Sequence, residues 1–165
     1  MSIPPIAVAL ARSGWNWQWN QLMKRLAPAD QEGNYKRPPS QHQEAIVPSS
    51  NELKNRTQQN LPYLIIGRSC PWAHRTWLVY ELRGLHSSLN LLMAKADFQT
   101  GQWEIDPPWL GCNSLLKIYQ KCGQPPNHRA TVPALIDPIA PNTHKPQLVG
   151  NESSQLIKVL NKWPT

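Results

Sequence analysis

The sequence has no apolar run near the ~18 residues that a membrane-spanning helix needs, and it has neither a collagen repeat nor sustained heptads. Charged residues are also scarce, at 16% of 165, against ~25% in an ordinary soluble domain. Hydrophobic residues make up 40% of the chain, enough for one modest core. These features exclude a transmembrane protein, a collagen and a coiled coil, and they indicate about one folded domain.

Acidic residues are fewer than basic ones, 10 against 17, which gives a net charge of +7. The basic residues are scattered, and only Lys24-Arg25 and Lys36-Arg37 are adjacent pairs. No basic helix face or nucleic-acid motif is present, so the charge suits a small anionic ligand better than nucleic acid. An unrelated basic module remains an alternative, and strongly salt-dependent binding to nucleic acid would indicate it.

Cysteine is limited to three residues, Cys70, Cys112 and Cys122. Their odd number and irregular spacing do not fit a disulfide framework, and no zinc-ligand spacing is present. The N-terminus lacks a basic segment before its apolar residues and contains Pro4-Pro5, which argues against a signal peptide. We therefore expect reduced thiols in a cytoplasmic protein without a metal.

Residues 1–60 are expected to form an N-terminal arm and a polar loop. Trp15, Trp17 and Trp19 alternate as in a strand, but the apolar residues that follow them have helical spacing, so this segment can be either. We expect the arm to pack its indoles on the core. Residues 28–60 are polar and rich in turn-forming residues, which predicts a long loop with little structure of its own.

Residues 61–165 are expected to form one domain. We expect strands at 61–67, 89–94, 131–137 and 147–150, a helix over 72–85, one short helix inside an insert at 97–129, and a last helix from Ser153. Two apolar sets at helical spacing predict that the helix over 72–85 is mostly buried. The order β-α-β, insert, β-β-α is that of the thioredoxin-like α/β fold.

Cys70 lies between an expected buried strand and an expected helix that begins with Pro71. The free N–H groups and the dipole at a helix N-terminus favour the thiolate over the thiol, and Arg75, one turn along, adds positive charge. An inert buried cysteine is the alternative. Ala73 occupies the third position after Cys70, so no CxxC disulfide can form here. A lone reactive thiol needs an external partner, and glutathione is the obvious one.

Two other segments fit glutathione. A cis Val132-Pro133 bond would expose the Val132 backbone to an extended peptide, although a trans proline on an edge strand is the commoner case. Ser153 at a helix start offers a hydroxyl and free N–H groups to a carboxylate, or it is an ordinary N-cap. Glu152 could pair with the ammonium group of the ligand or be solvated.

Residues 69–76, SCPWAHRT, resemble the signature of the glutathionyl-hydroquinone reductases, the xi class of glutathione transferases. Residues 131–133 and 151–154 are similar to that family's two glutathione-contact segments. Residues 33–37 followed by Ser40 are similar to its upstream arm. The likeness covers nearly the whole chain.

The resemblance implies that Cys70 attacks the thioether sulfur of a glutathionyl-hydroquinone, so that the hydroquinone leaves and a mixed disulfide forms. A second glutathione then releases glutathione disulfide. Trp103, Val132-Pro133, Glu152 and Ser153 would hold glutathione as a co-substrate, with Tyr119 in support. The family usually has an arginine one turn before this tyrosine, and here only Lys117 could substitute for it.

The family also has a second, all-helical domain beyond the position of Thr165, and the resemblance implies that most of the quinone pocket lies there. A fragment, a split form and a degenerate single domain are all compatible with this sequence. We expect the chain alone to self-associate or to be marginally stable, because an uncovered apolar face drives association. A non-catalytic glutathione-binding domain of the same fold is the alternative to the enzyme.

Overall fold

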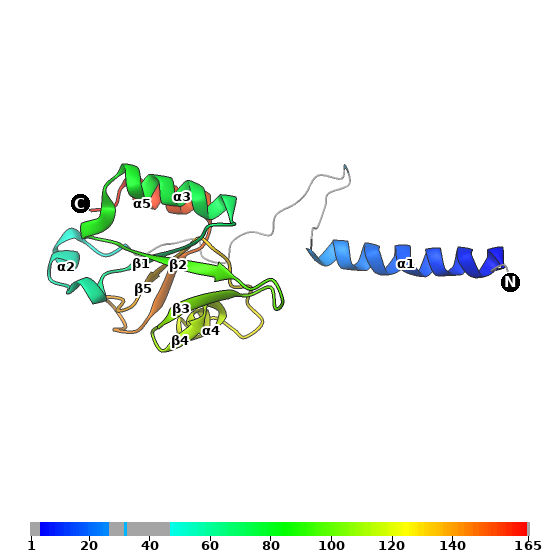
Figure 1. Ribbon diagram of the computed structural model, residues 1–165. Helices are drawn as coiled ribbons and strands as arrows, with labels where there is room; N and C mark the ends of the chain where they lie inside the picture. The colour runs from blue at the N-terminus through cyan, green and yellow to red at the C-terminus, as the bar shows by residue number, and fades with distance from the viewer. Residues whose placement is uncertain (1–3, 27–31, 33–46, 165) are drawn as a thin grey trace. The chain divides into compact units, whose positions relative to one another are not determined.

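The computed structural model describes residues 4–26, 32 and 47–164, and the chain divides into two units, Met1–Pro39 and Ser40–Thr165 (Figure 1). The described part of the first unit contains the helix α1 over Pro5–Leu26. No helix in the described parts combines the length and apolar character that crossing a bilayer requires. Residues 33–37 and Ser40, which resemble the family's upstream arm, lie outside the described residues.

The helix α1 settles the choice between strand and helix that the tryptophan pattern left open. Val8, Trp15 and Leu22 recur every seven residues along one side, while Leu10 and Trp17 recur about 200° further round. The helix therefore has two apolar sides rather than one. Within this unit the indoles are exposed, by 65% at Trp15 and 64% at Trp17. Packing of the arm on the core stays a prediction.

The second unit has the predicted order β-α-β, insert, β-β-α, and the α/β assignment is confirmed. Its helices are α2 (Ser50–Lys54), η1 (Gln58–Asn60), α3 (Pro71–Leu82), η2 (Leu85–Ser87), α4 (Leu115–Lys121) and α5 (Ser153–Asn161). Its strands are β1 (Tyr63–Gly67), β2 (Asn90–Ala96), β3 (Trp103–Trp109), β4 (Cys112–Ser114), β5 (Ala134–Asp137) and β6 (Gln147–Gly150).

The strands form one sheet in the order β4-β3-β2-β1-β5-β6. The strand β1 is central and pairs in parallel with β2, with Gly67 opposite Ala94, and antiparallel with β5, with Ile65 opposite Ala134. The helices α3 and α5 pack on each other over one face of the sheet, and α4 lies on the other side beside β3 and β4 (Figure 1). The core fills the space between these layers.

The expectation of a single short helix in the insert was incomplete, because β3 and β4 also form there and extend the sheet beyond β2. The proline pair at 107–108 argued against a strand, since proline cannot donate to a ladder. In the structure the Asp106-Pro107 bond is cis, and the pairing of β3 with β4 changes register between Glu104 and Trp109. The prolines thus lie where regular pairing is interrupted.

The expectation of a mostly buried helix over 72–85 was wrong. Only Ala73, Thr76 and Tyr80 are fully buried in α3, whereas Leu78 is 51% and Leu82 is 86% exposed. The sheet and α5 cover one side of α3, so Leu78 and Leu82 lie on the opposite side, away from the core. Leu85, the third residue of that apolar set, follows α3 and is buried.

Residues 47–60 contain α2 and η1, so the expectation of a long loop over residues 28–60 was wrong for this part. Residues 28–31 and 33–46 lie outside the described residues. Ser49 and Glu52 form a capping box at the start of α2, a signal present in the sequence. The Arg56 guanidinium donates to both carboxylate oxygens of Asp137, at 2.7 and 3.1 Å, and to the backbone oxygens of Asn60 and Ile139. This buried pair fixes the segment against the end of β5.

Replacing Arg56 with methionine should lower the free energy of unfolding by about 3 kcal/mol, because it leaves the Asp137 carboxylate buried without its partner. Urea denaturation measures the change. The matched control is Lys95→Met, since the Lys95–Asp106 pair is exposed by 68% and 71% and should contribute less than about 1 kcal/mol. Equal effects of the two substitutions would contradict this assignment.

Candidate functional site

The thiol of Cys70 stands at the turn between β1 and α3, as predicted. The Cys70 N–H donates to the Gly67 carbonyl at 3.0 Å and closes the turn. Cys70 is the N-cap of α3 in an extended conformation, and Pro71 occupies the first helical turn, where a missing N–H costs nothing. The half-buried side chain therefore lies at the N-terminus of a helix of 12 residues.

The structure brings Cys70 and Val132 together. The Val132-Pro133 peptide bond is cis, which answers the question that the sequence left open. The Cys70 thiol donates to the Val132 carbonyl oxygen, with 3.4 Å between sulfur and oxygen. Both Val132 and Pro133 are buried. The register of β1 and β5 places the end of β1, which Cys70 follows, beside the start of β5, which Val132 precedes.

Trp103, at the start of β3, lies against the same turn. A β-carbon built on Gly67 would lie 2.3 Å from the nearest atom of the Trp103 ring. The close approach requires glycine at position 67, because any side chain there would occupy the space of the indole. Trp103 therefore lies next to Gly67, and the Gly67 carbonyl accepts the hydrogen bond from the Cys70 N–H.

Ser153 is the first residue of α5, and its side chain is 1% exposed. Its hydroxyl oxygen has no hydrogen-bond partner among the described residues. The N-cap is Glu152, and the Ser153 hydroxyl does not cap the helix. The Ser154 hydroxyl donates to the Glu152 carboxylate at 3.4 Å. The site thus contains a buried hydroxyl at a helix N-terminus, a setting that favours an anion.

The three expected supporting residues have different positions. The Arg75 guanidinium lies 5.9 Å from the centre of the Trp72 ring, on the exposed side of α3. Lys117 is exposed and donates to Asn113 at 3.4 Å. Tyr119 is buried and its hydroxyl donates to the Thr131 carbonyl at 2.8 Å, so it fixes the segment that leads to Val132.

Burial raises the pKa of two side chains, those of Tyr119 and Cys122, and so keeps both protonated at neutral pH. Burial raises the pKa of Tyr119 to about 12, so its hydroxyl is a neutral donor at physiological pH. Burial, and then the charge of Cys112, raise the pKa of Cys122 to about 12. A thiol with a raised pKa is a poor nucleophile because little thiolate is present. Since Cys112 is also buried, Cys70 is the best placed of the three cysteines to react.

A cavity of about 220 Å³ opens beside Trp103. Its lining residues are Gly101, Gln102, Trp103, Leu116, His128, Arg129, Ala130 and Thr131. Lys117 is absent from this lining. Arg129 was missed by the sequence analysis, although a basic residue three positions before Val132 could have been noticed. Among the described residues, no group of three His, Cys, Asp or Glu side chains is placed to hold a metal ion.

Replacing Gly67 with alanine should lower the free energy of unfolding by about 1–3 kcal/mol, because the added methyl group must displace the Trp103 ring. In a Trp103→Ala background the same substitution should cost much less, and a double-mutant cycle measures the difference. Gly14→Ala is the control, since nothing lies within 4 Å of its added β-carbon. Equal costs of Gly67→Ala in both backgrounds would contradict the contact.

Comparisons with known proteins agree with this arrangement. A family model described as the glutathione S-transferase N-terminal domain matches residues 69–163. The glutathionyl-hydroquinone reductase PcpF of Sphingobium chlorophenolicum is 28% identical over 106 residues, which cover 60% of this chain and 32% of that protein. Glutathione S-transferase omega-like 2 of Schizosaccharomyces pombe is 27% identical over 140 residues, which cover 81% of this chain and 42% of that protein.

The fold has relatives among solved structures. The glutathione S-transferase Xi of Phanerochaete chrysosporium matches with a TM-score of 0.59 and 26% identity, over 81% of this chain and 43% of that one. The chain therefore spans between about a third and two fifths of the length of these relatives.

Proposed function

The chain belongs to the family of glutathione S-transferase N-terminal domains, and from this membership we propose that it is a glutathione-dependent thiol reductase or transferase in which Cys70 reacts. The observation that carries the proposal is the position of the Cys70 sulfur, at the N-terminus of α3 and 3.4 Å from the Val132 oxygen. A side chain at this position faces the free N–H groups of the first helical turn and the positive end of the helix dipole, which suits the binding of an anionic peptide such as glutathione.

The surrounding residues supply complementary groups for the two ends of glutathione. The Ser153 hydroxyl and the first N–H groups of α5 suit the γ-glutamyl carboxylate, and the Glu152 carboxylate suits the neighbouring ammonium group. Trp103 and Arg129 border the cavity, where the glycyl end of the peptide would lie. The cysteinyl part would then lie along Val132-Pro133, with its sulfur towards Cys70.

The relative PcpF is a glutathionyl-hydroquinone reductase, and it suggests glutathionyl-hydroquinones as the substrate class. The Cys70 thiolate attacks the sulfur of a glutathionyl-hydroquinone, and a disulfide forms between Cys70 and glutathione. The bond from sulfur to the aryl carbon breaks, and that carbon keeps the electron pair and takes a proton. A second glutathione thiolate attacks the mixed disulfide, which releases glutathione disulfide and restores Cys70. The reaction needs reduced thiols and so suits the cytoplasm.

Incubation with glutathione disulfide should add one glutathione to the wild-type chain and none to Cys70→Ala, as measured by intact mass. Cys122→Ala is the matched control and should still take up one glutathione, because burial of Cys122 keeps its thiol protonated.

An adduct that persists in Cys70→Ala would contradict the assignment of Cys70. Glutathione binding without any adduct in the wild type would favour the alternative, a non-catalytic glutathione-binding domain. In that case Cys70→Ala should bind glutathione as well as the wild type does.

Replacing Ser153 with alanine should weaken glutathione binding about tenfold, because a hydrogen bond to a charged group contributes about 1.5–3 kcal/mol. The free energy of unfolding without ligand should stay the same or rise, since the substitution removes a buried hydroxyl that has no partner. Calorimetric titration and urea denaturation measure the two quantities. A hydroxyl that serves only as a helix cap would show the reverse pattern, with lower stability and unchanged affinity.

A further inference from the structure

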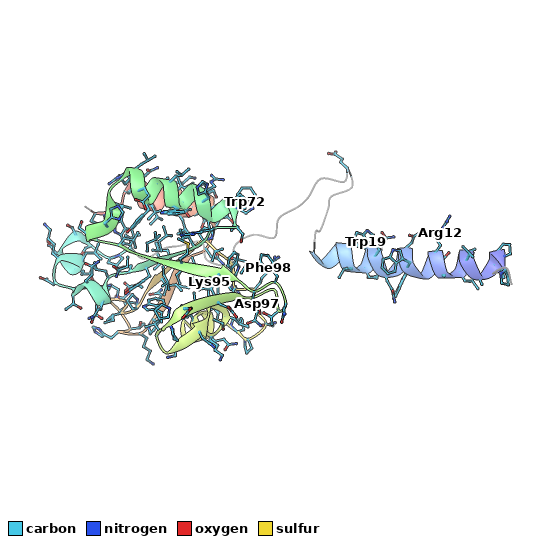
Figure 2. All side chains as sticks on the ribbon, viewed as in Figure 1. Arg12, Trp19, Trp72, Lys95, Asp97 and Phe98 are labelled. Carbon is cyan, nitrogen blue, oxygen red and sulfur yellow. The ribbon has the colours of Figure 1, made fainter. Side chains whose placement is uncertain are left out.

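Phe98 is the single phenylalanine of the sequence, and its side chain is 91% exposed. It lies in the turn between β2 and β3 (Figure 2). Phenylalanine is among the residue types most often buried, and nothing in the core of this domain uses the ring. The exposed ring is therefore available to contact a ligand or another molecule rather than the core.

The turn that carries Phe98 is firmly built. The Asp97 carboxylate accepts from the Gln99 N–H at 2.9 Å and from the Thr100 hydroxyl. The Asp97 N–H donates to the Gln102 carbonyl at 2.9 Å, and the Asp97 carbonyl accepts from the Gly101 N–H at 2.8 Å. The hydrogen bonds from the Thr100 hydroxyl and the Gln99 N–H lower the pKa of the Asp97 carboxyl. Phe98 is thus presented to solvent from a hydrogen-bonded turn.

The turn leads directly into the proposed site. Gly101, Gln102 and Trp103 all line the cavity beside Cys70's turn. A second exposed aromatic residue, Trp72, follows Cys70 by two positions and is 52% exposed. Figure 2 shows Trp72 and Phe98 at the end of the domain where α3 begins. Two exposed rings therefore border the region that contains the thiol.

We propose that Phe98 is a specificity-determining residue that packs against the aromatic ring of an aryl thioether of glutathione. This inference rests on the proposed function and deepens it, because it assigns a contact to the group carried on the glutathione sulfur. Aromatic rings attract each other in offset or edge-to-face pairs beyond the effect of their buried area. The hydrogen bonds of the turn already define the backbone at Phe98, which lowers the entropy lost on forming this contact.

The test compares binding of S-phenylglutathione and S-methylglutathione to the 165-residue chain by calorimetric titration. The wild type should prefer the phenyl compound. Phe98→Ala should weaken binding of S-phenylglutathione about three- to tenfold, the range expected for the loss of one aromatic pair. The same variant should leave binding of S-methylglutathione unchanged. Phe98→Tyr, which keeps a ring, should retain the preference for the phenyl compound.

Leu82→Ala is the matched control, because Leu82 is 86% exposed but lies at the other end of α3. It should change neither affinity. An unchanged preference for the phenyl compound in Phe98→Ala would overturn the inference and leave the proposed function intact. Failure of the wild type to bind either compound would overturn the inference, and absence of a Cys70 adduct with glutathione disulfide would then overturn the proposed function separately. An effect of Phe98→Ala on self-association alone, seen by light scattering, would also overturn the inference.

Discussion

Parallel pairing of β1 with β2 forces the chain to return from one end of the sheet to the other, because two parallel strands cannot be joined by a tight turn. The return path is α3, so a helix must begin where β1 ends. The antiparallel neighbour β5 enters the sheet at this same end. The start of α3 and the residues before β5 are therefore close together, whatever their separation in sequence. Cys70 and Val132, which are 62 residues apart, meet for this reason.

The second constraint is the small size of the side chains beside that meeting point. Gly67 is opposite Ala94 on β2, and Trp103 on β3 is opposite Ala96. Paired residues and alternate residues of a strand share a face of the sheet, so a row of small residues lies where the Trp103 ring extends towards β1. The indole thus reaches the turn of Cys70 from a strand that is not adjacent to β1. Larger residues in this row would keep Trp103 away from the site.

The sequence was most informative where signals are local. The apolar run that ends at Gly67, the proline after Cys70 and the polar residues before α5 correctly predicted the main elements and the position of the thiol. The pair of Arg56 and Asp137 joins residues 81 positions apart, and no local pattern predicts such a contact. The strand β3 was missed because its prolines oppose strand formation, and they are tolerated only where the register changes. The exposed side of α3 was missed because periodicity identifies apolar faces but not which of them is covered.

The buried pair of Arg56 and Asp137 is hydrogen-bonded in the supporting part of the structure, whereas the buried Ser153 hydroxyl of the proposed site lacks a partner among the described residues. The Arg56 guanidinium and the Asp137 carboxylate satisfy each other, and Arg56 also donates to two backbone carbonyls. In the described residues, the Ser153 hydroxyl and the Trp163 indole N–H are the buried side-chain groups that lack a partner. An unpaired buried hydroxyl lowers stability, and Ser153 lies at the one end of α5 where an anion is favoured by the helix dipole. The Trp163 indole lies beyond the C-terminal end of α5, where the helix dipole disfavours an anion. A bound carboxylate would accept the hydrogen bond that the Ser153 hydroxyl does not make in the free protein. Binding would then remove the cost of the unpaired hydroxyl, and that free energy would add to the affinity for the ligand.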